Sequence, residues 1–194
     1  FDFIFLKIIL FSISFNKSPV RSNPVPVSAV YSKTSTPSAP IIWDKKNNKG
    51  FCKVLIINAG NANAHTGKEG INRINKKTKI IAKKYNCSVN KILVSSTGVI
   101  GEKLDENKII KAFLNIETKN EKDIFTASKA IMTTDTYSKT ALENVIIKSK
   151  KINVFGFAKG SGMIAPNMGT MLGYIFIESN ILKKDLKKIL KSHL

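Results

Sequence analysis

Cysteine and histidine are scarce in this sequence, and the shortage excludes several kinds of site. Its 194 residues include two cysteines, Cys52 and Cys87, which form neither a C-x-x-C pair nor a zinc-ligand spacing. The two histidines, His65 and His193, lie far apart, and neither has a partner at ligand spacing. We therefore expect no metal site and two reduced thiols in a cytoplasmic protein. For His65, which lies in a segment rich in Asn, Ala and Gly, the sequence allows a site-lining role but favours local packing.

Acidic residues are also few, because 13 Asp and Glu stand against 32 Lys and Arg, for a formal net charge of +19. This surplus raises the hypothesis of a nucleic-acid-binding module, since Lys and Arg neutralise phosphates. The lysines, however, recur on the polar faces of helical patterns without interleaved aromatic residues or a nucleic-acid-binding motif. We expect a solvated surface and no nucleic-acid partner, and salt-dependent retention on DNA would support the alternative.

A long hydrophobic run is absent as well. Residues 1–15 are strongly apolar, but Asp2 and Lys7 interrupt them, and the stretch is too short to span a bilayer. No A-x-A-like cleavage site follows, which argues against a signal peptide. We predict one or two buried strands here and no membrane association. Because the chain begins with Phe1 rather than methionine, we expect a fragment whose true start is missing.

The rest of the chain predicts an alternation of strands and helices. Residues 16–40 hold five of the six prolines, so this zone should be loop and edge strand. Apolar runs predict strands at 53–58, 92–95, 144–148, 151–158 and 171–177, the third and fourth forming a hairpin. Helical periodicity, with Lys on the outer faces, predicts helices at 68–85, 105–116 with Asp105 as N-cap, 121–132, and 182 to the end.

The stretch from Lys159 to Leu172 places a lysine, three glycines and a threonine just before an apolar strand. A threonine hydroxyl becomes a nucleophile when its own α-amine, freed by cutting the preceding bond, acts as base. Gly169 suits that cut, because glycine tolerates the strained backbone it requires. On residue types alone, Gly169-Thr170 is more often a tight turn. A phosphate-binding P-loop is excluded, since Lys159 precedes Gly160.

Four motifs, at residues 58–67, 94–101, 130–136 and 159–172, occur in an order that resembles one enzyme family. From about Ala29 onward, the chain resembles the bifunctional ornithine acetyltransferase / N-acetylglutamate synthase (glutamate N-acetyltransferase) family of arginine biosynthesis. Residues 1–28 match that family poorly. The small residues of 58–67 also allow close backbone approach to a ligand or another segment.

The resemblance implies a layered α/β fold of the self-cleaving N-terminal-nucleophile type, with the strand after Gly169 in a central sheet. We expect this fold to be incomplete at both ends. Self-cleavage would divide the chain into an α-segment, 1–169, and the start of a β-segment, 170–194. The family's segments assemble as a heterotetramer of two α and two β segments, which the resemblance implies here too.

The chemistry that the resemblance implies starts with attack of the Thr170 hydroxyl on the Gly169 carbonyl. The freed Thr170 then takes the acetyl group from N2-acetylornithine, releases ornithine and passes the acetyl to glutamate. No bound cofactor is implied, although some family members also take acetyl from acetyl-CoA. Thr97 and Gly98 would form the oxyanion hole, whereas by residue type alone they would be an ordinary turn.

Thr133 and Lys159 match the family's substrate-binding residues, together with Thr170. Two departures from the family bear on function. Gly169 replaces the usual alanine before the nucleophile, and only 25 residues follow the cut, so that part of the substrate pocket is missing. We therefore predict that this chain alone is inactive. A self-cleaving aminopeptidase or amidase, and a non-catalytic truncated remnant, remain as alternatives.

Overall fold

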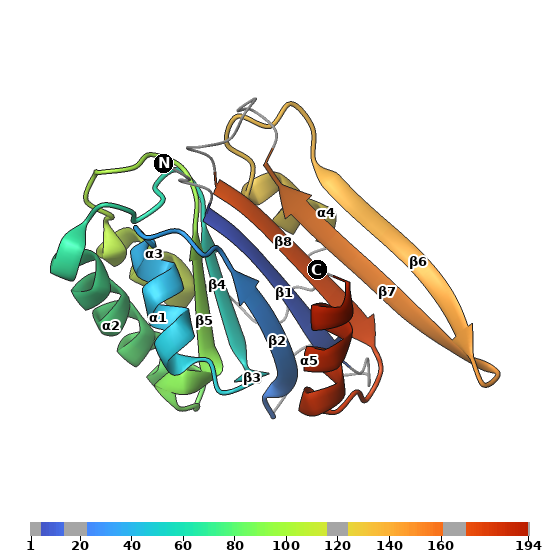
Figure 1. The fold of residues 1–194 in the computed structure, drawn as a ribbon. Helices are drawn as coiled ribbons and strands as arrows, with labels where there is room; N and C mark the ends of the chain where they lie inside the picture. The colour runs from blue at the N-terminus through green and yellow to red at the C-terminus, as the bar shows by residue number, and fades with distance from the viewer. Residues whose placement is uncertain (1–4, 14–22, 116–123, 161–169, 194) are drawn as a thin grey trace.

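The computed structural model describes residues 5–13, 23–115, 124–160 and 170–193. Within these ranges the chain forms two sheets and several helices arranged in layers (Figure 1). The strands of the larger sheet are β1 (Phe5–Ile13), β2 (Val25–Tyr31), β3 (Phe51–Cys52), β6 (Lys139–Ile147), β7 (Lys150–Lys159) and β8 (Thr170–Glu178). None of the described helices is both long enough and apolar enough to cross a membrane.

The larger sheet has the order β3-β2-β1-β8-β7-β6, which places β8 in its centre. β8 runs parallel to β1, with Thr170 opposite Phe5, and antiparallel to β7, with Leu172 opposite Lys159. β6 and β7 form a hairpin whose turn places Lys148 and Ser149 at positive φ. β8, the predicted nucleophile strand, is therefore hydrogen-bonded on both sides.

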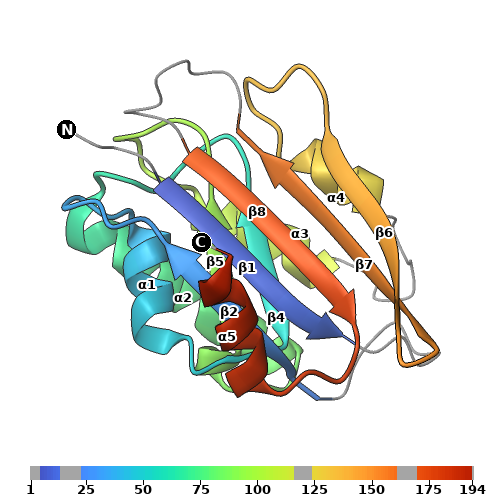
Figure 2. The ribbon, with the colours of Figure 1, turned by 45° about the vertical axis from the view of Figure 1, so that its right-hand side comes forward.

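The smaller sheet pairs β4 (Val54–Asn58) with β5 (Ile92–Ser96) in parallel. One of its faces is covered by α1 (Ala39–Asn47), α2 (Gly67–Lys84) and α3 (Glu106–Asn115), and a short 3₁₀ turn, Val89–Lys91, leads into β5. α4 (Ile124–Ala130) lies beside β6 and β7, whereas α5 (Lys183–Ser192) covers the opposite face of the larger sheet (Figure 2). The order of layers is helix, large sheet, small sheet, helices.

The core follows from the alternation of side chains along the strands. In β5, Leu93 points to the larger sheet, whereas Ile92 and Val94 point to the helices. The cluster between the sheets contains Val27, Cys52, Leu93, Ile131, Phe157, Leu172 and Tyr174. Full burial of a large apolar side chain contributes about 1.5–3 kcal/mol, so these layers account for most of the fold's cohesion.

Most elements predicted from the sequence are confirmed, with shifts of a few residues at their ends. β1 confirms a strand within residues 1–15, and α2, α3 and α5 confirm three of the predicted helices. Asp105 is the N-cap of α3, since its Oδ1 accepts hydrogen bonds from the N–H groups of Asn107 and Lys108. Among the described residues, neither Cys52 nor Cys87 forms a disulfide, in agreement with the expected reduced thiols.

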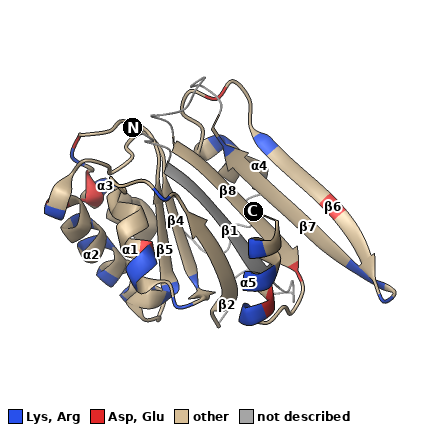
Figure 3. Cartoon of the chain, in the orientation of Figure 1, with Lys and Arg blue, Asp and Glu red and all other residues tan. Residues whose placement is uncertain are grey.

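Two expectations about the elements were wrong. The proline-rich zone 16–40 contains the start of α1, where Pro40 stands in the first turn and its missing N–H removes no helical hydrogen bond. Lys77 does not lie on the outer face of α2, because its side chain is fully buried beside Ile74 and Ile81. The other charged residues of α1, α2 and α5, whose positions are coloured on the ribbon in Figure 3, are exposed or half-buried, except the buried Asp44 of α1.

Candidate active site

Thr170 is the first residue of β8, and its side chain lies on the inner face of the larger sheet. The residues two and four positions later, Leu172 and Tyr174, face the smaller sheet in the buried cluster. Because side chains alternate along a strand, Thr170 shares that face. Lys159, directly opposite Leu172, points the same way and is buried. Thr170 and Lys159 are therefore diagonal neighbours on adjacent strands.

Lys159 joins two threonines that come from distant parts of the chain. Its Nζ donates to Thr97 Oγ1 at 3.1 Å and to Thr133 Oγ1 at 2.6 Å. Thr97 directly follows β5 and is fully buried, whereas Thr133 follows α4 and is exposed. The cluster thus extends from the interior of the fold to the solvent, as a substrate site requires.

Asp135 is the acidic partner of this cluster. Its Oδ2 lies 3.6 Å from Lys159 Nζ and accepts a long hydrogen bond from the Thr133 N–H at 3.4 Å. Its Oδ1 accepts from the Gly160 N–H and from Lys139 Nζ, both at 2.9 Å. One buried carboxylate therefore connects the end of β7, the start of β6 and the loop that carries Thr133.

The surroundings shift the pKa values of both charged groups. Burial alone would raise the pKa of Asp135, but hydrogen bonds from Lys139, Gly160 and Thr133 and the nearby Lys159 together lower it well below its ordinary value. Burial also lowers the pKa of the Lys159 ammonium, and the charge of Asp135 opposes this effect. Asp135 is therefore an anion at neutral pH, a state in which it stabilises the charged form of Lys159.

Gly98 follows Thr97 in a backbone conformation that only glycine adopts readily. Its φ is +127°, and a Cβ atom there would lie 2.2 Å from the carbonyl carbon of Gly60. Within the described part of the chain, the Gly98 N–H has no hydrogen-bond acceptor. An open backbone N–H beside a buried hydroxyl is the arrangement that an oxyanion hole uses.

The motif at 58–67 supports this loop directly. The Asn58 carbonyl accepts a hydrogen bond from the Thr97 N–H at 3.0 Å, and the Gly60 carbonyl accepts from the Val99 N–H at 3.1 Å. The Ser96 hydroxyl donates to Asn58 Oδ1 at 2.6 Å. The small residues of 58–67 therefore permit close approach to another segment of the chain, which was one of the two predicted alternatives.

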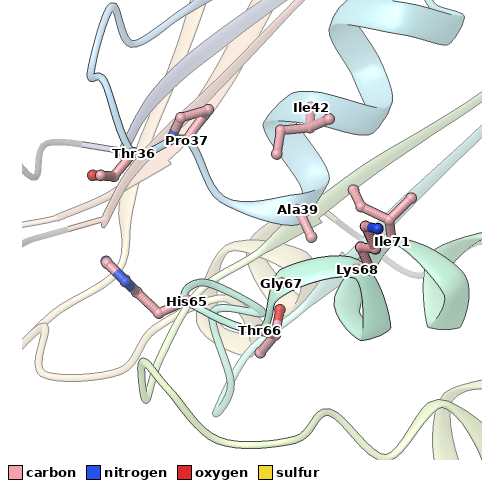
Figure 4. A pocket seen from close by; sticks show the side chains of 9 residues that line it. All are labelled: Thr36, Pro37, Ala39, Ile42, His65, Thr66, Gly67, Lys68 and Ile71. Atoms are coloured by element: carbon pink, nitrogen blue, oxygen red, sulfur yellow. The ribbon is translucent and has the colours of Figure 1, made fainter.

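A separate pocket of about 300 Å³ lies where α1 and α2 begin (Figure 4). None of the site residues predicted from the sequence lines it. His65 does line it and is exposed, although the sequence favoured local packing for this side chain. The residues lining the pocket are Thr36, Pro37, Ala39, Ile42, His65, Thr66, Gly67, Lys68 and Ile71.

The structure brings together most of the predicted site residues. Thr97, Thr133 and Lys159 meet, with Gly98 beside them and Thr170 at the start of the neighbouring strand. Gly169 lies outside the described residues. Sequence reasoning did not assign a role to Asp135, although it belongs to the motif 130–136. Among the described residues, no group of three or more Cys, His, Asp or Glu could hold a metal ion.

Comparisons with known proteins identify relatives of this chain. The sequence pattern of the ArgJ family matches residues 19–194. The arginine biosynthesis bifunctional protein ArgJ of Bradyrhizobium diazoefficiens is 44% identical over 168 residues, which are 86% of this chain and 41% of that protein. Its counterpart from Thermotoga neapolitana is 40% identical over 172 residues, 87% of this chain and 43% of that protein. The chain thus spans about two fifths of the length of these curated relatives.

A solved structure shares the fold. The arginine biosynthesis bifunctional protein argJ from Bacillus halodurans superposes with a TM-score of 0.63 at 28% identity, over 78% of this chain and 85% of the solved chain. This similarity confirms the layered α/β fold expected from the sequence.

Proposed function

This chain belongs to the ArgJ family, and from that premise we propose that it carries the nucleophile and oxyanion hole of an acetyltransferase of arginine biosynthesis. The reaction is transfer of the acetyl group of N2-acetylornithine to glutamate, giving ornithine and N-acetylglutamate. The observation that carries the proposal is the meeting of Thr97, Thr133 and Lys159 beside the strand that begins with Thr170.

The proposed chemistry begins with self-cleavage. The Thr170 hydroxyl attacks the Gly169 carbonyl, and the resulting ester is hydrolysed, which leaves residues 1–169 and a second segment with a free Thr170 α-amine. The position of Thr170 at the start of β8, on the same face of the sheet as Lys159, supports this step.

Acetyl transfer follows as a ping-pong cycle through an acetyl group on Thr170. The α-amine of Thr170 takes the proton of its hydroxyl, and the Gly98 N–H and Thr97 hydroxyl stabilise the tetrahedral oxyanion. Thr133, which is exposed, and Lys159, a cation suited to a carboxylate, lie on the substrate side. No bound cofactor takes part in this cycle, and acetyl-CoA is a second acetyl donor to be tested.

The proposal extends to the whole protein. We infer that its α and β segments form a heterotetramer in the cytoplasm and that the present chain, at two fifths of the relatives' length, does not turn over alone. The alternative is a self-cleaving aminopeptidase or amidase with the same nucleophile. That enzyme would release free acetate from its acyl-enzyme instead of N-acetylglutamate.

The deciding measurement is the intact mass of the purified chain under denaturing conditions, with Thr170→Ala as control. Two masses that divide the chain between Gly169 and Thr170, absent from the control, would support the self-processing nucleophile. If this chain stays whole, the same measurement on a chain extended to the relatives' full length decides, and an uncut full-length chain would contradict the mechanism. Assays of the cut protein for acetylated glutamate against free acetate then separate the two enzyme classes.

A further inference from the structure

The ammonium of Lys159 has three protein groups near it. It donates to Thr133 Oγ1 at 2.6 Å and to Thr97 Oγ1 at 3.1 Å, and Asp135 Oδ2 lies 3.6 Å away. An ammonium has three N–H donors and no acceptor. Two of these donors bind threonine hydroxyls, and the ammonium also has a carboxylate at ion-pair distance, so a substrate carboxylate would compete with Asp135 for Lys159.

In the hydrogen bond between Lys159 and Thr97, the donor and the acceptor are fixed. Because Lys159 can only donate, the Thr97 oxygen must accept, so the hydroxyl proton points elsewhere. In the described part of the chain, no acceptor for that proton is present. A hydroxyl that accepts a hydrogen bond from a cation also becomes a stronger donor. The Thr97 proton is thus available to an oxyanion, next to the open N–H of Gly98.

We propose that Asp135 and Lys159 are positioning residues that orient and polarise the Thr97 hydroxyl for the oxyanion, an inference that rests on the proposed function. Asp135 acts through Lys159, with which it forms an ion pair. Its carboxylate accepts hydrogen bonds from the backbone N–H groups of Gly160, the residue after Lys159, and of Thr133. These bonds fix the two backbone segments that lie beside the lysine. The Lys159 ammonium is thereby held towards Thr97. Through Thr97 it acts on the chemical step, in addition to any contact that it makes with substrate.

The test is a double-mutant cycle on acetyl transfer by the chain extended to full length. Thr97→Val removes the hydroxyl and should lower kcat about 10²–10³-fold. Lys159→Met should lower kcat by at least ~10-fold, and the double variant should fall no further than Thr97→Val alone, since both changes remove one device. Asp135→Asn should lower kcat in the same direction, with KM within about two-fold. Lys108→Met, at an exposed lysine distant in the fold, is the matched control.

Each other outcome has a definite meaning. The inference would be overturned if the losses of kcat multiplied in the double variant. It would also be overturned if Lys159→Met raised KM and left kcat unchanged, which would assign the lysine to substrate binding alone. If Asp135→Asn does not fold, judged by circular dichroism, the cycle of Thr97 and Lys159 still decides. If the unchanged full-length protein transfers no acetyl group, the proposed function fails and this inference fails with it.

Discussion

Gly98 shows how a single residue fixes the geometry of the proposed oxyanion hole. Its positive φ turns the chain immediately after Thr97, and its missing Cβ lets the loop lie against the backbone of Gly60 and Asn61. The Gly98 N–H has no acceptor among the described residues. Glycine at this position therefore serves both folding and the proposed chemistry.

We predict that Gly98→Ala lowers the free energy of unfolding by more than ~2 kcal/mol. A Cβ there would lie 2.2 Å from the Gly60 carbonyl carbon and 2.5 Å from the Asn61 nitrogen, so backbone must move in addition to the strain of a positive φ. The measurement is denaturant unfolding followed by circular dichroism.

Gly101→Ala is the matched control for this change. Gly101 also has a positive φ, +88°, but nothing lies within 4 Å of the position that a Cβ would take there. Its substitution should cost only the backbone strain, about 1 kcal/mol. Equal losses for the two variants would contradict the argument that contact with Gly60 makes Gly98 necessary.

For single residues, the sequence identified which residues belong to the proposed site better than it identified their contacts. Thr97, Thr133 and Lys159 were chosen by motif, and the structure places them within hydrogen-bond distance although 26 and 62 residues separate the threonines from the lysine. Asp135 was not singled out, because a polar cluster after a helix also reads as a cap and turn. Its role depends on the approach of Gly160, which no local pattern reveals.

Among the helices and strands, α2 is amphipathic but has one charged residue on its buried face. Its buried face contains Ile74, Thr78 and Ile81, and Lys77 lies among them fully buried, with no hydrogen-bond partner for its Nζ in the described residues. Burial lowers the pKa of Lys77 to about 8, against the weaker opposite influence of Asp44 and Glu106. The folded state therefore disfavours the charged lysine.

We predict that stability rises with pH between about 8 and 9.5, below the range in which the buried tyrosines Tyr31 and Tyr174, with their raised pKa values, oppose the effect. In this range the unfolded chain keeps a proton on Lys77 that the folded chain has lost, so raising the pH favours folding. Each pKa unit corresponds to about 1.4 kcal/mol, so the rise over this range should be about 1.5 kcal/mol. Lys77→Met should remove this rise and stabilise the protein at pH 7.

Urea unfolding at several pH values between 7 and 9.5 measures this effect. Lys79→Met changes an exposed lysine on the same helix and should leave the pH dependence as it was. A flat profile in the unchanged protein, or the same rise in Lys77→Met, would show that Lys77 is not the titrating group.

The elements themselves were mostly predictable, because period and apolar runs are local properties. β4, β5, β8 and α2 were predicted within a few residues of their observed ends. α1 was missed because proline suggests loop, whereas a proline in the first helical turn breaks no hydrogen bond. The pairing of β8 with β1, across more than 150 residues of sequence, could not be derived from either strand alone.

At the scale of the whole molecule, the layers explain how two cut segments could remain one protein. Residues 170–193 contribute β8 and α5, and β8 lies between β1 and β7 in the large sheet. Leu172 and Tyr174 belong to the central cluster, while Leu186 and Leu190 of α5 pack against Val30 on the other face. Separation of the segments would expose apolar residues on both faces of the large sheet and break the pairing of β8 with β1 and with β7.

We therefore predict that cleavage before Thr170 leaves the segments associated. On a size-exclusion column in native buffer, cut protein should elute as one peak at the volume of the uncut Thr170→Ala variant, and denaturing mass analysis of that peak should show both pieces. The physical reason is that β8 keeps its pairing with β1 and β7 after the peptide bond is lost. Elution of residues 1–169 without the second segment would mean that the central strand is held mainly by its covalent connection, and the layered core would then not be the source of cohesion inferred from the burial of Leu172 and Tyr174.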